Sequence, residues 1–231
     1  LLYRTDAFRT KELAANVEQV LVVFASRPSF NLWFLWKSLL AARAAGIDAT
    51  VVRNKTDLED GAAAAQAALE EIGSLGWRTV AVSARSNPQH AIAVLGPITR
   101  ERRSLLVGQS GMGKSTLLNL LVPDAQARTR EYSERLDLGK QTTTAARWFG
   151  LPAGGAIVDT PGFQEFGLAH LSLADVVAGF PEFESHLGRC RFLDCRHLAE
   201  PDCAILSAVG AGKITPGRYE FYRALAEARP R

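Results

Sequence analysis

The sequence predicts a three-layer α/β domain built on a mainly parallel sheet, followed by a small helical module that binds a metal ion. Buried apolar runs alternate with helical segments through most of the chain, which is typical of a sheet with helices on both faces. The strand signal fades after about residue 163, and all three cysteines lie between residues 190 and 203. We therefore expect a first domain at 1–168 and a second, helical domain at 169–231.

The first domain contains four predicted strands, of which the first two, 19–25 and 48–54, are expected to be buried on both faces. The third is 78–84, and the fourth lies within 103–111, where it runs into a Gly-rich turn. The segments that follow them carry helical periodicity, and we expect helices at 31–45, 61–72, 89–95 and 114–121. Gly46 ends the helix at 31–45, where Trp33 and Trp36 lie three residues apart and are expected to pack in the core.

The rest of the chain is predicted as a loop, a strand pair and a terminal helix. Residues 124–144 are polar and rich in Arg and Thr, which indicates a long loop. The runs at 145–151 and 155–162 indicate two strands, and the segment at 217–231 indicates an amphipathic helix.

The composition is that of an ordinary globular protein. The chain has 231 residues, 47% hydrophobic and 22% charged, with a net charge of +3 that is too small to establish a nucleic-acid partner. No apolar run reaches the ~18 residues of a membrane helix, so no membrane partner is expected. We expect a monomeric, cytoplasmic protein. Because the sequence does not start with Met, we also expect it to begin within a longer protein.

A phosphate-binding loop is predicted at "GQSGMGKS", residues 108–115, which fits G-x-x-x-x-G-K-[ST]. Its glycines let backbone N–H groups surround a phosphate, and the helix that follows adds its positive N-terminal end. Lys114 can reach the β- and γ-phosphates, and the Ser115 hydroxyl can bind Mg²⁺. A glycine-rich turn with a surface lysine is the alternative, but the strand before and the helix after disfavour it. The expected nucleotide-binding residues here are Gly108, Gln109, Ser110, Gly111, Met112, Gly113, Lys114, Ser115 and Thr116.

Guanine recognition is predicted at "RNKTDL", residues 53–58, which ends the second strand. The Asp57 carboxylate can accept hydrogen bonds from guanine N1–H and N2–H₂ together, whereas adenine offers an acceptor at N1 and no N2 donor. Ser83 and Ala84 end the next strand, where backbone N–H groups could meet guanine O6. The expected base-binding residues are Asn54, Lys55, Thr56, Asp57, Ser83 and Ala84.

A further loop, "DTPG" at 159–162, follows the last predicted strand. Asp159 can hold Mg²⁺ through water, and the Gly162 N–H can sense a γ-phosphate. GTPase domains ordinarily run phosphate loop, switch Thr, Asp-x-x-Gly, Asn-Lys-x-Asp and Ser-Ala, whereas this chain starts with the last two motifs. That order predicts a circularly permuted P-loop GTPase domain, which is feasible because domain termini often lie close together. Residues 96–103 are the expected joint.

A zinc site is predicted at Cys190-x₄-Cys195-x-His197-x₅-Cys203. Three thiolates and one imidazole make a closed, structural Cys₃His set with no position left for a catalytic water. Three buried free cysteines are the alternative, and the Pro- and charge-rich composition of the stretch disfavours it. His90, His170 and His186 fit no such spacing.

This motif order, with "GQSGMGKSTLLN", "TTTAAR", "DTPGFQEFG" and the Cys/His cluster, resembles the RsgA (YjeQ) family of circularly permuted GTPases. The resemblance covers nearly the whole chain. It implies a bacterial factor that binds the small ribosomal subunit and its rRNA late in assembly, with GTP hydrolysis stimulated by that subunit. It also implies an N-terminal OB-fold that contacts rRNA and is not in this sequence, and it supports all four zinc ligands.

One expected catalytic residue, Gln141, departs from the family pattern. We expect Lys114, Thr143 and Gln141 to act in hydrolysis, with Thr143 also binding Mg²⁺ beside Ser115. The family usually has His at position 141, and the resemblance implies that this His assists hydrolysis. The Gln141 amide can hold a water but cannot act as a base. Phe163 follows Asp-x-x-Gly where Ras-like GTPases often have a water-orienting Gln.

Two other functions remain open from the residues alone. One is a GTP-gated RNA- or protein-binding module in which hydrolysis is incidental. The other is a zinc-dependent nucleic-acid binder with a vestigial nucleotide site, and the intact Asp57, Lys114 and Ser115 count against it.

Overall fold

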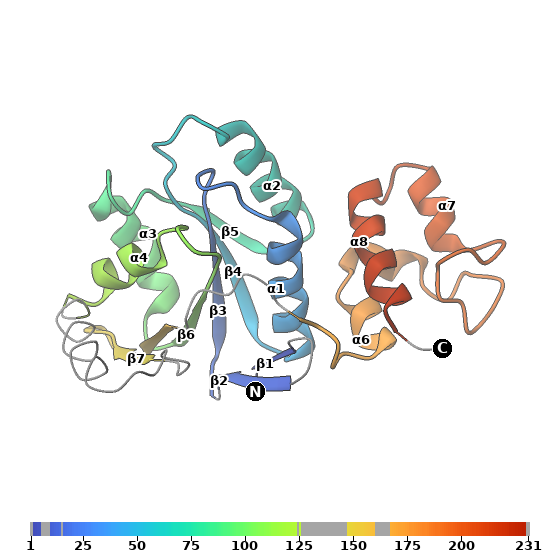
Figure 1. Ribbon diagram of the computed structural model, residues 1–231, viewed down its shortest axis with the longest axis horizontal. Helices are drawn as coiled ribbons and strands as arrows, with labels where there is room; N and C mark the ends of the chain where they lie inside the picture. The colour runs from blue at the N-terminus through green and yellow to red at the C-terminus, as the bar shows by residue number, and fades with distance from the viewer. Residues whose placement is uncertain are drawn as a thin grey trace, which may run out of the picture.

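The computed structural model describes residues 2–5, 10–14, 16–123, 125, 147–159 and 167–229. Its centre is a six-stranded sheet with strand order β5-β4-β3-β6-β8-β7 (Figure 1). The strands are β3 Gln19–Phe24, β4 Asp48–Arg53, β5 Arg78–Ala81, β6 Arg103–Val107, β7 Arg147–Gly150 and β8 Ala156–Asp159. All neighbours are parallel except β7 and β8, which are antiparallel. The predicted mainly parallel sheet and the predicted strand pair are confirmed.

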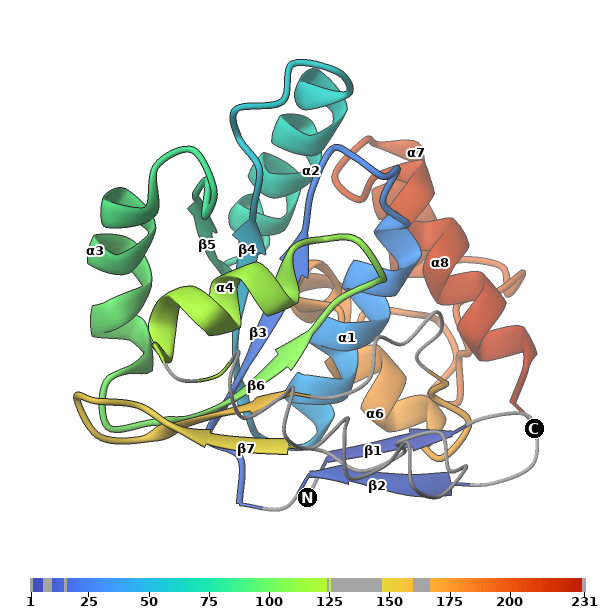
Figure 2. The same cartoon turned by 60° about the vertical axis from the view of Figure 1, so that its left-hand side comes forward.

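Helices cover both faces of this sheet and make the three predicted layers (Figure 2). The helices α1 Leu32–Ala44 and α2 Ala62–Ser74 lie on one face, and α3 Pro88–Thr99 and α4 Lys114–Leu121 lie on the other. The central strands β3 and β4 are buried along nearly their whole length, as their continuous Val and Leu content predicts. The order of the strands places the carboxyl ends of β4, β5, β6 and β8 along one edge of the sheet, which is where the sequence motifs lie.

The third helix is longer than predicted. We expected 89–95, but α3 begins at Pro88, is capped by the Asn87 side chain and continues through Pro97 to Thr99. Proline usually ends a helix because it lacks an N–H group, and this is why the sequence pattern appeared to stop. Here the Thr99 hydroxyl donates to Leu95 O at 3.0 Å in the final turn. The predicted joint at 96–103 is therefore helical in its first half.

Two elements at the start of the chain were not predicted. The strands β1 Leu2–Thr5 and β2 Thr10–Ala14 pair antiparallel in a separate two-stranded sheet. This hairpin lies near the end of α1, away from the carboxyl edge of the main sheet (Figure 1).

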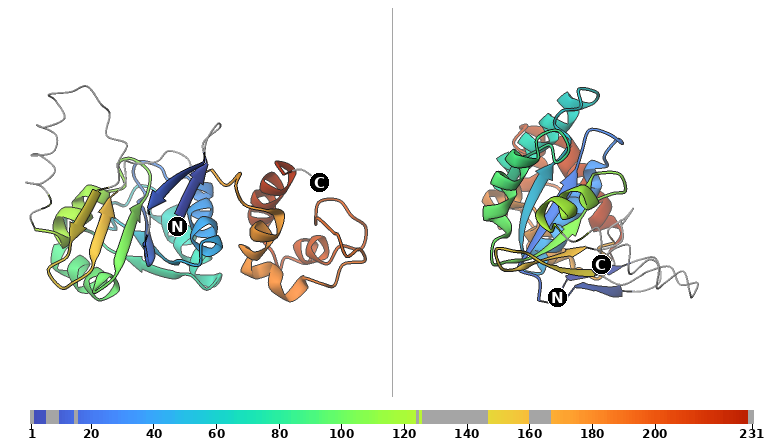
Figure 3. Two further views of the ribbon diagram at one scale, coloured as in Figure 1. Left: turned by 90° about the horizontal axis from the view of Figure 1, so that it is seen from below. Right: turned by 90° about the vertical axis from the view of Figure 1, so that its left-hand side faces the viewer.

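The C-terminal residues form a small helical module beside α1 (Figure 3). Its elements are α6 Leu173–Ala178, the 3₁₀ helix η1 Pro181–His186, α7 Ala204–Gly210 and α8 Pro216–Glu227. A capping box between Ser172 and Asp175 starts α6. The aromatic rings of Phe180, Phe183, Phe221 and Tyr222 pack together in its core. The predicted domain boundary between 168 and 169 stays a prediction. Among the described residues, no helix is long and apolar enough to cross a membrane.

Candidate nucleotide site and metal centre

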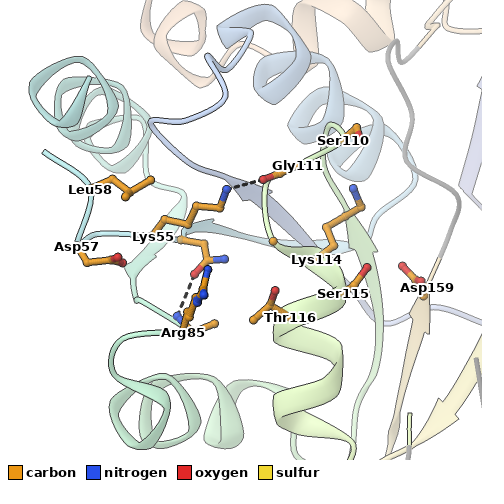
Figure 4. Close-up of a pocket in the computed structure, with 13 residues that line it drawn as sticks. Lys55, Asp57, Leu58, Arg85, Ser110, Gly111, Lys114, Ser115, Thr116 and Asp159 are labelled. Atoms are coloured by element: carbon orange, nitrogen blue, oxygen red, sulfur yellow. Dashed lines mark hydrogen bonds between the residues drawn. The ribbon is translucent and has the colours of Figure 1, made fainter. Parts of the chain in front are cut away.

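A cavity of about 690 Å³ lies at the carboxyl ends of β4, β5, β6 and β8. Its lining residues are Asn54, Lys55, Asp57, Leu58, Ala84, Arg85, Ser110, Gly111, Gly113, Lys114, Ser115, Thr116 and Asp159. Figure 4 shows two groups facing each other across it. Asp57, Leu58, Lys55 and Arg85 lie on one side, and Lys114, Ser115, Thr116 and Asp159 lie on the other. The sheet thus brings together two groups of residues that lie far apart in the sequence.

The phosphate loop runs from β6 into α4 and needs glycine at two positions for steric reasons. A Cβ atom at Gly108 would lie 2.4 Å from the backbone oxygen of Val23. Gly113 has φ +91°, and a Cβ atom there would lie 2.3 Å from Asn54 Nδ2. Any larger residue would push the loop away from its neighbours. The two glycines of the motif are therefore explained by close backbone approach.

Lys114 begins α4 and is half-buried beside this loop. Its Nζ donates to the backbone oxygens of Gly108 at 2.6 Å and Gln109 at 2.9 Å. Burial lowers the pKa of Lys114, and the charge of Asp159 opposes that shift. Burial in turn raises the pKa of Asp159, against the charges of Lys114 and Arg147. An ammonium and a carboxylate at the same end of the cavity suit a ligand that brings both phosphate and a cation.

Asn54 holds three parts of the site together and is only 2% exposed. Its Nδ2 donates to Met112 O in the phosphate loop at 3.1 Å, and its Oδ1 accepts from the Ala84 N–H at 3.1 Å. The Ala84 N–H, which we expected to meet guanine O6, is thus directed at Asn54 in this structure. Lys55 has φ +59°, and its Nζ donates to Gly111 O at 2.7 Å and to Arg27 O at 2.9 Å.

Asp57 is exposed at the opposite end of the cavity from Lys114. The Ser83 hydroxyl donates to its Oδ1, and the Ser86 hydroxyl donates to Ser83 Oγ at 2.6 Å. These hydroxyl contacts, the Ser83 contact first, lower the pKa of Asp57, with a smaller contribution from the charge of Arg85. The carboxylate is thereby oriented and kept ionised, as a group that accepts two N–H donors from a base must be.

Eleven of the predicted nucleotide-binding residues line the cavity, and five described ones do not. Thr56 is exposed beside the cavity, and Gly108 and Met112 are buried beneath it. Ser83 donates a hydrogen bond to Asp57, and Gln109 accepts one from the Asn31 N–H. Leu58 and Arg85 line the cavity and were missed, although each directly follows a predicted residue. Gln141, Thr143 and Gly162 lie outside the described residues.

The four predicted metal ligands come together in the C-terminal module. The ligand atoms of Cys190, Cys195, His197 and Cys203 all lie within 4.8 Å of one another. His197 Nδ1 is 3.5 Å from Cys190 Sγ and 3.4 Å from Cys203 Sγ, and those two sulfurs are 3.9 Å apart. A tetrahedral zinc ion with Zn–S bonds of ~2.3 Å separates its thiolates by about 3.8 Å. The donor set and its spacing therefore fit a structural zinc ion.

The loop that carries these ligands is held by Glu200. Its carboxylate accepts from the backbone N–H groups of Arg196 at 2.9 Å, Leu198 at 2.8 Å and Ala199 at 3.1 Å. Burial opposes ionisation of Glu200, but these N–H donors outweigh it and lower its pKa to about 2. The hydroxyl of Tyr219 donates to His197 O at 2.9 Å, and that of Tyr222 donates to Arg196 O at 2.8 Å. The loop is thus fixed from α8 as well.

The fold and the cavity define a P-loop GTPase domain with permuted motifs, followed by a Cys₃His module. The family model described as RsgA GTPase matches residues 1–169. The chain is 48% identical over 229 residues to "Small ribosomal subunit biogenesis GTPase RsgA" of Ralstonia pickettii (strain 12J), covering 97% of this chain and 73% of that one. It is also 48% identical over 237 residues to the protein of that name from Bordetella pertussis (strain Tohama I), covering 100% and 78%. The chain belongs to the RsgA GTPase family.

Solved structures agree with this assignment. YjeQ from Thermotoga maritima matches with a TM-score of 0.72 and 30% identity, over 92% of this chain and 71% of that one. YloQ, described as a circularly permuted GTPase, matches the fold with a TM-score of 0.72 at 24% identity, over 99% and 80% of the two chains. The permutation predicted from the motif order is confirmed.

Proposed function

We propose that this protein binds and hydrolyses GTP and acts in late assembly of the small ribosomal subunit, with hydrolysis stimulated by that subunit. The observation that carries the nucleotide assignment is the single cavity lined by both Asp57 and Lys114, with Asn54 joining the loops around it. The assembly role is supported by the name that the relatives share. A protein with this role acts in the cytoplasm, and we expect it to act as a monomer.

Each part of the cavity has a proposed role. The loop from Gly108 to Thr116 binds the phosphates through its backbone N–H groups. Lys114 Nζ, which donates to the backbone oxygens of Gly108 and Gln109, donates to phosphate oxygens instead. Asp57 reads the guanine edge, while the alkyl chains of Lys55 and Arg85 flank the base. A magnesium ion bound with the nucleotide would neutralise charge that develops on the phosphates. Ser115 and, through water, Asp159 are its proposed ligands.

The catalytic assignments rest on the sequence alone. Thr143 is proposed to bind Mg²⁺, Gly162 to contact the γ-phosphate and Gln141 to hold the attacking water. The family pattern of His before the Thr run favours position 141 for this role. Replacing an imidazole by an amide removes the possibility of proton abstraction by that side chain. We therefore expect slow hydrolysis by the protein alone.

The Cys₃His set is proposed to hold one structural zinc ion. Its ligands leave no open coordination position, so the ion orders the module rather than taking part in hydrolysis. Metal binding of this kind supplies folding free energy to a small domain.

Sedimentation of the protein with purified small ribosomal subunits tests the proposed role. We expect co-sedimentation with a non-hydrolysable GTP analogue and weaker co-sedimentation with GDP, because the γ-phosphate orders the switch segments. The corresponding non-hydrolysable ATP analogue should give no more co-sedimentation with the subunit than GDP does. Equal binding in all three nucleotides would contradict a GTP-dependent role on the subunit.

A further inference from the structure

The helix α1 is buried on two sides. Its sequence, "LWFLWKSLLAARA", is apolar around most of its circumference, which indicates a helix packed between two layers rather than one at a surface. One side covers β3 and β4, and the other faces the C-terminal module (Figure 1). Trp36, which is only 3% exposed, lies on this second side. The module is therefore docked on the nucleotide-binding domain through this helix.

The contact between α1 and the module is close and directional. The Phe221 ring of α8 lies 5.5 Å from the Trp33 ring and 5.3 Å from the Trp36 ring, centroid to centroid. The Arg218 guanidinium lies 5.0 Å from the Trp36 centroid and forms a buried ion pair with Glu182 at 2.6 Å.

The end of α6 fits equally tightly. A Cβ atom added at Gly179, the C-cap of α6, would lie 2.6 Å from Leu40 Cγ on α1. A shift of α1 must therefore move α6 and α8, because densely packed side chains leave no room to absorb it.

The other end of this arrangement is the phosphate loop. The N-cap residue of α1 is Asn31, whose side chain accepts from the N–H groups of Trp33 and Phe34. Its own N–H donates to Gln109 Oε1 at 2.8 Å. A second contact lies three residues earlier, where a Cβ atom at Gly111 would be 3.0 Å from the Pro28 ring. The start of α1 is thus joined to the loop that surrounds the phosphates.

Lys114 makes this junction sensitive to a bound phosphate. Its Nζ donates to Gln109 O, the backbone oxygen of the residue whose side chain contacts Asn31. Phosphate oxygens compete for the same ammonium group, because charged acceptors bind it more strongly than neutral carbonyls do. When Lys114 turns to a phosphate, Gln109 loses one of its restraints.

We propose that Gln109 is a positioning residue that couples nucleotide binding to docking of the C-terminal module, with α1 as the connecting element. The coupling rests on the proposed nucleotide site and adds a regulatory link to it. Linkage makes the effect reciprocal, so loosening the module on α1 changes nucleotide affinity by the factor by which nucleotide changes docking. No direct contact between the module and the nucleotide is required.

A double-mutant cycle tests the proposal, with GDP affinity measured by titration of a fluorescent GDP. Trp33→Ala removes an edge contact with Phe221 at a residue that is 38% exposed, so the fold should be retained. We expect it to change GDP affinity on the order of fivefold. Gln109→Leu removes the acceptor at similar size and changes GDP affinity by itself. In that background, Trp33→Ala should change the affinity by less than about twofold, because the link is already cut.

The matched control is Ile92→Ala on α3, which removes an apolar side chain that is 46% exposed and lies away from the module. It should leave GDP affinity unchanged in both backgrounds. Gly179→Ala perturbs the same interface by adding an atom, and its effect on affinity should likewise depend on Gln109. Hydrogen exchange of the α8 amides tests the coupling without a mutation at the interface. GDP should change the exchange rates of these amides in the unmodified protein and leave them unchanged in Gln109→Leu.

Two results would overturn the inference. The first is that neither Trp33→Ala nor Gly179→Ala changes GDP affinity. The second is that each changes GDP affinity by the same factor in the unmodified protein and in Gln109→Leu. If the unmodified protein bound neither GDP nor GTP, the proposed function itself would fail, and the first titration distinguishes that case from the other two.

Discussion

At the scale of single residues, Asn54 explains how a permuted chain still builds one nucleotide site. Its two amide atoms contact the phosphate loop and the loop after β5, and Gly113 approaches its Nδ2 so closely that no Cβ would fit. These contacts depend on which strand ends are neighbours in the sheet. They do not depend on the order of those strands along the chain.

The first prediction concerns base selectivity. Asp57→Asn should weaken GTP binding by about 2–3 kcal/mol, because it replaces a charge-assisted acceptor by an amide that presents a donor to the base. Affinity for xanthosine triphosphate should rise, since xanthine carries an acceptor where guanine has its amino group. Titration with both nucleotides measures this. The control is Asp60→Asn. Asp60 is an exposed carboxylate in the same loop and pairs with Arg27, so this variant should bind both nucleotides as the unmodified protein does.

The second prediction concerns pH. The Ser83 hydroxyl lowers the pKa of Asp57, so the carboxylate stays ionised to lower pH than an unaided Asp, and base recognition is lost only as the pH falls through that lowered value. Ser83→Ala should raise the pKa and make GTP affinity begin to fall at a higher pH. Affinities measured from neutral pH down to below the ordinary Asp pKa of about 3.9 show this shift. Superimposable pH profiles for the two proteins would contradict the role given to Ser83.

At the scale of elements, the turn from the phosphate loop into α4 yields a third prediction. Gly113→Ala should destabilise the protein by about 2–4 kcal/mol, because the new Cβ meets Asn54 Nδ2 and the backbone φ of +91° is unfavourable. Gly76 has φ +87° but nothing within 4 Å of an added Cβ. Gly76→Ala should therefore cost only about 1 kcal/mol. Urea unfolding of both variants separates steric contact from backbone conformation, and equal losses would show that Asn54 does not restrict position 113.

The zinc module yields a fourth prediction. Cys195→Ser and His197→Ala should each lose bound zinc and loosen the loop that Glu200 and α8 hold, because the metal joins ligands from residues 190 to 203. Metal analysis and hydrogen exchange of the 190–203 amides measure the two effects. His186→Ala changes a histidine outside the cluster and should retain one zinc per chain. Zinc content that is the same in all three variants would exclude this ligand set.

The sequence predicts those elements whose signal is local. The phosphate loop and the buried strands each occupy a few consecutive residues with a characteristic pattern, so their positions agree with the structure. The four members of the Cys₃His cluster, which the structure brings together, were singled out in the same way. The last turn of α3 was missed because Pro97 obscures a helix that tertiary packing maintains. The hairpin of β1 and β2 was missed as well.

Other features depend on contacts across the chain and leave little trace in any single segment. Leu58 and Arg85 line the cavity only because β4 and β5 are neighbours in the sheet. Trp33 and Trp36 were both expected to pack in the core, and Trp36 is buried, whereas Trp33 is 38% exposed. The apolar circumference of α1 could not show that the C-terminal module supplies one of the two surfaces.

At the scale of the whole molecule, the permutation keeps the phosphate-loop strand in the middle of the sheet. The strand β6 lies between β3 and β8, so the site is supported from both sides although the chain starts elsewhere. Arg229 of the C-terminal module donates to Leu168 O, just before the expected domain boundary, at 2.6 Å and to Leu171 O, just after it, at 2.8 Å. Both carbonyls lie shortly after Asp159 in the chain. The module therefore contacts the first domain both through α1 and through Leu168.

The central claim is that this chain is a GTPase whose hydrolysis depends on the small ribosomal subunit, and its most direct test is GTP turnover with and without purified subunits. Alone, the protein should turn over far more slowly than the ~1–100 s⁻¹ of kinases, because the Gln141 amide proposed to hold the attacking water cannot act as a base. Small subunits should raise the rate by orders of magnitude, and large subunits should not. Gln141→Ala should lower the stimulated rate while GTP affinity stays nearly unchanged. A rate that small subunits leave unaltered would contradict the claim and favour a GTP-gated binding module in which hydrolysis is incidental.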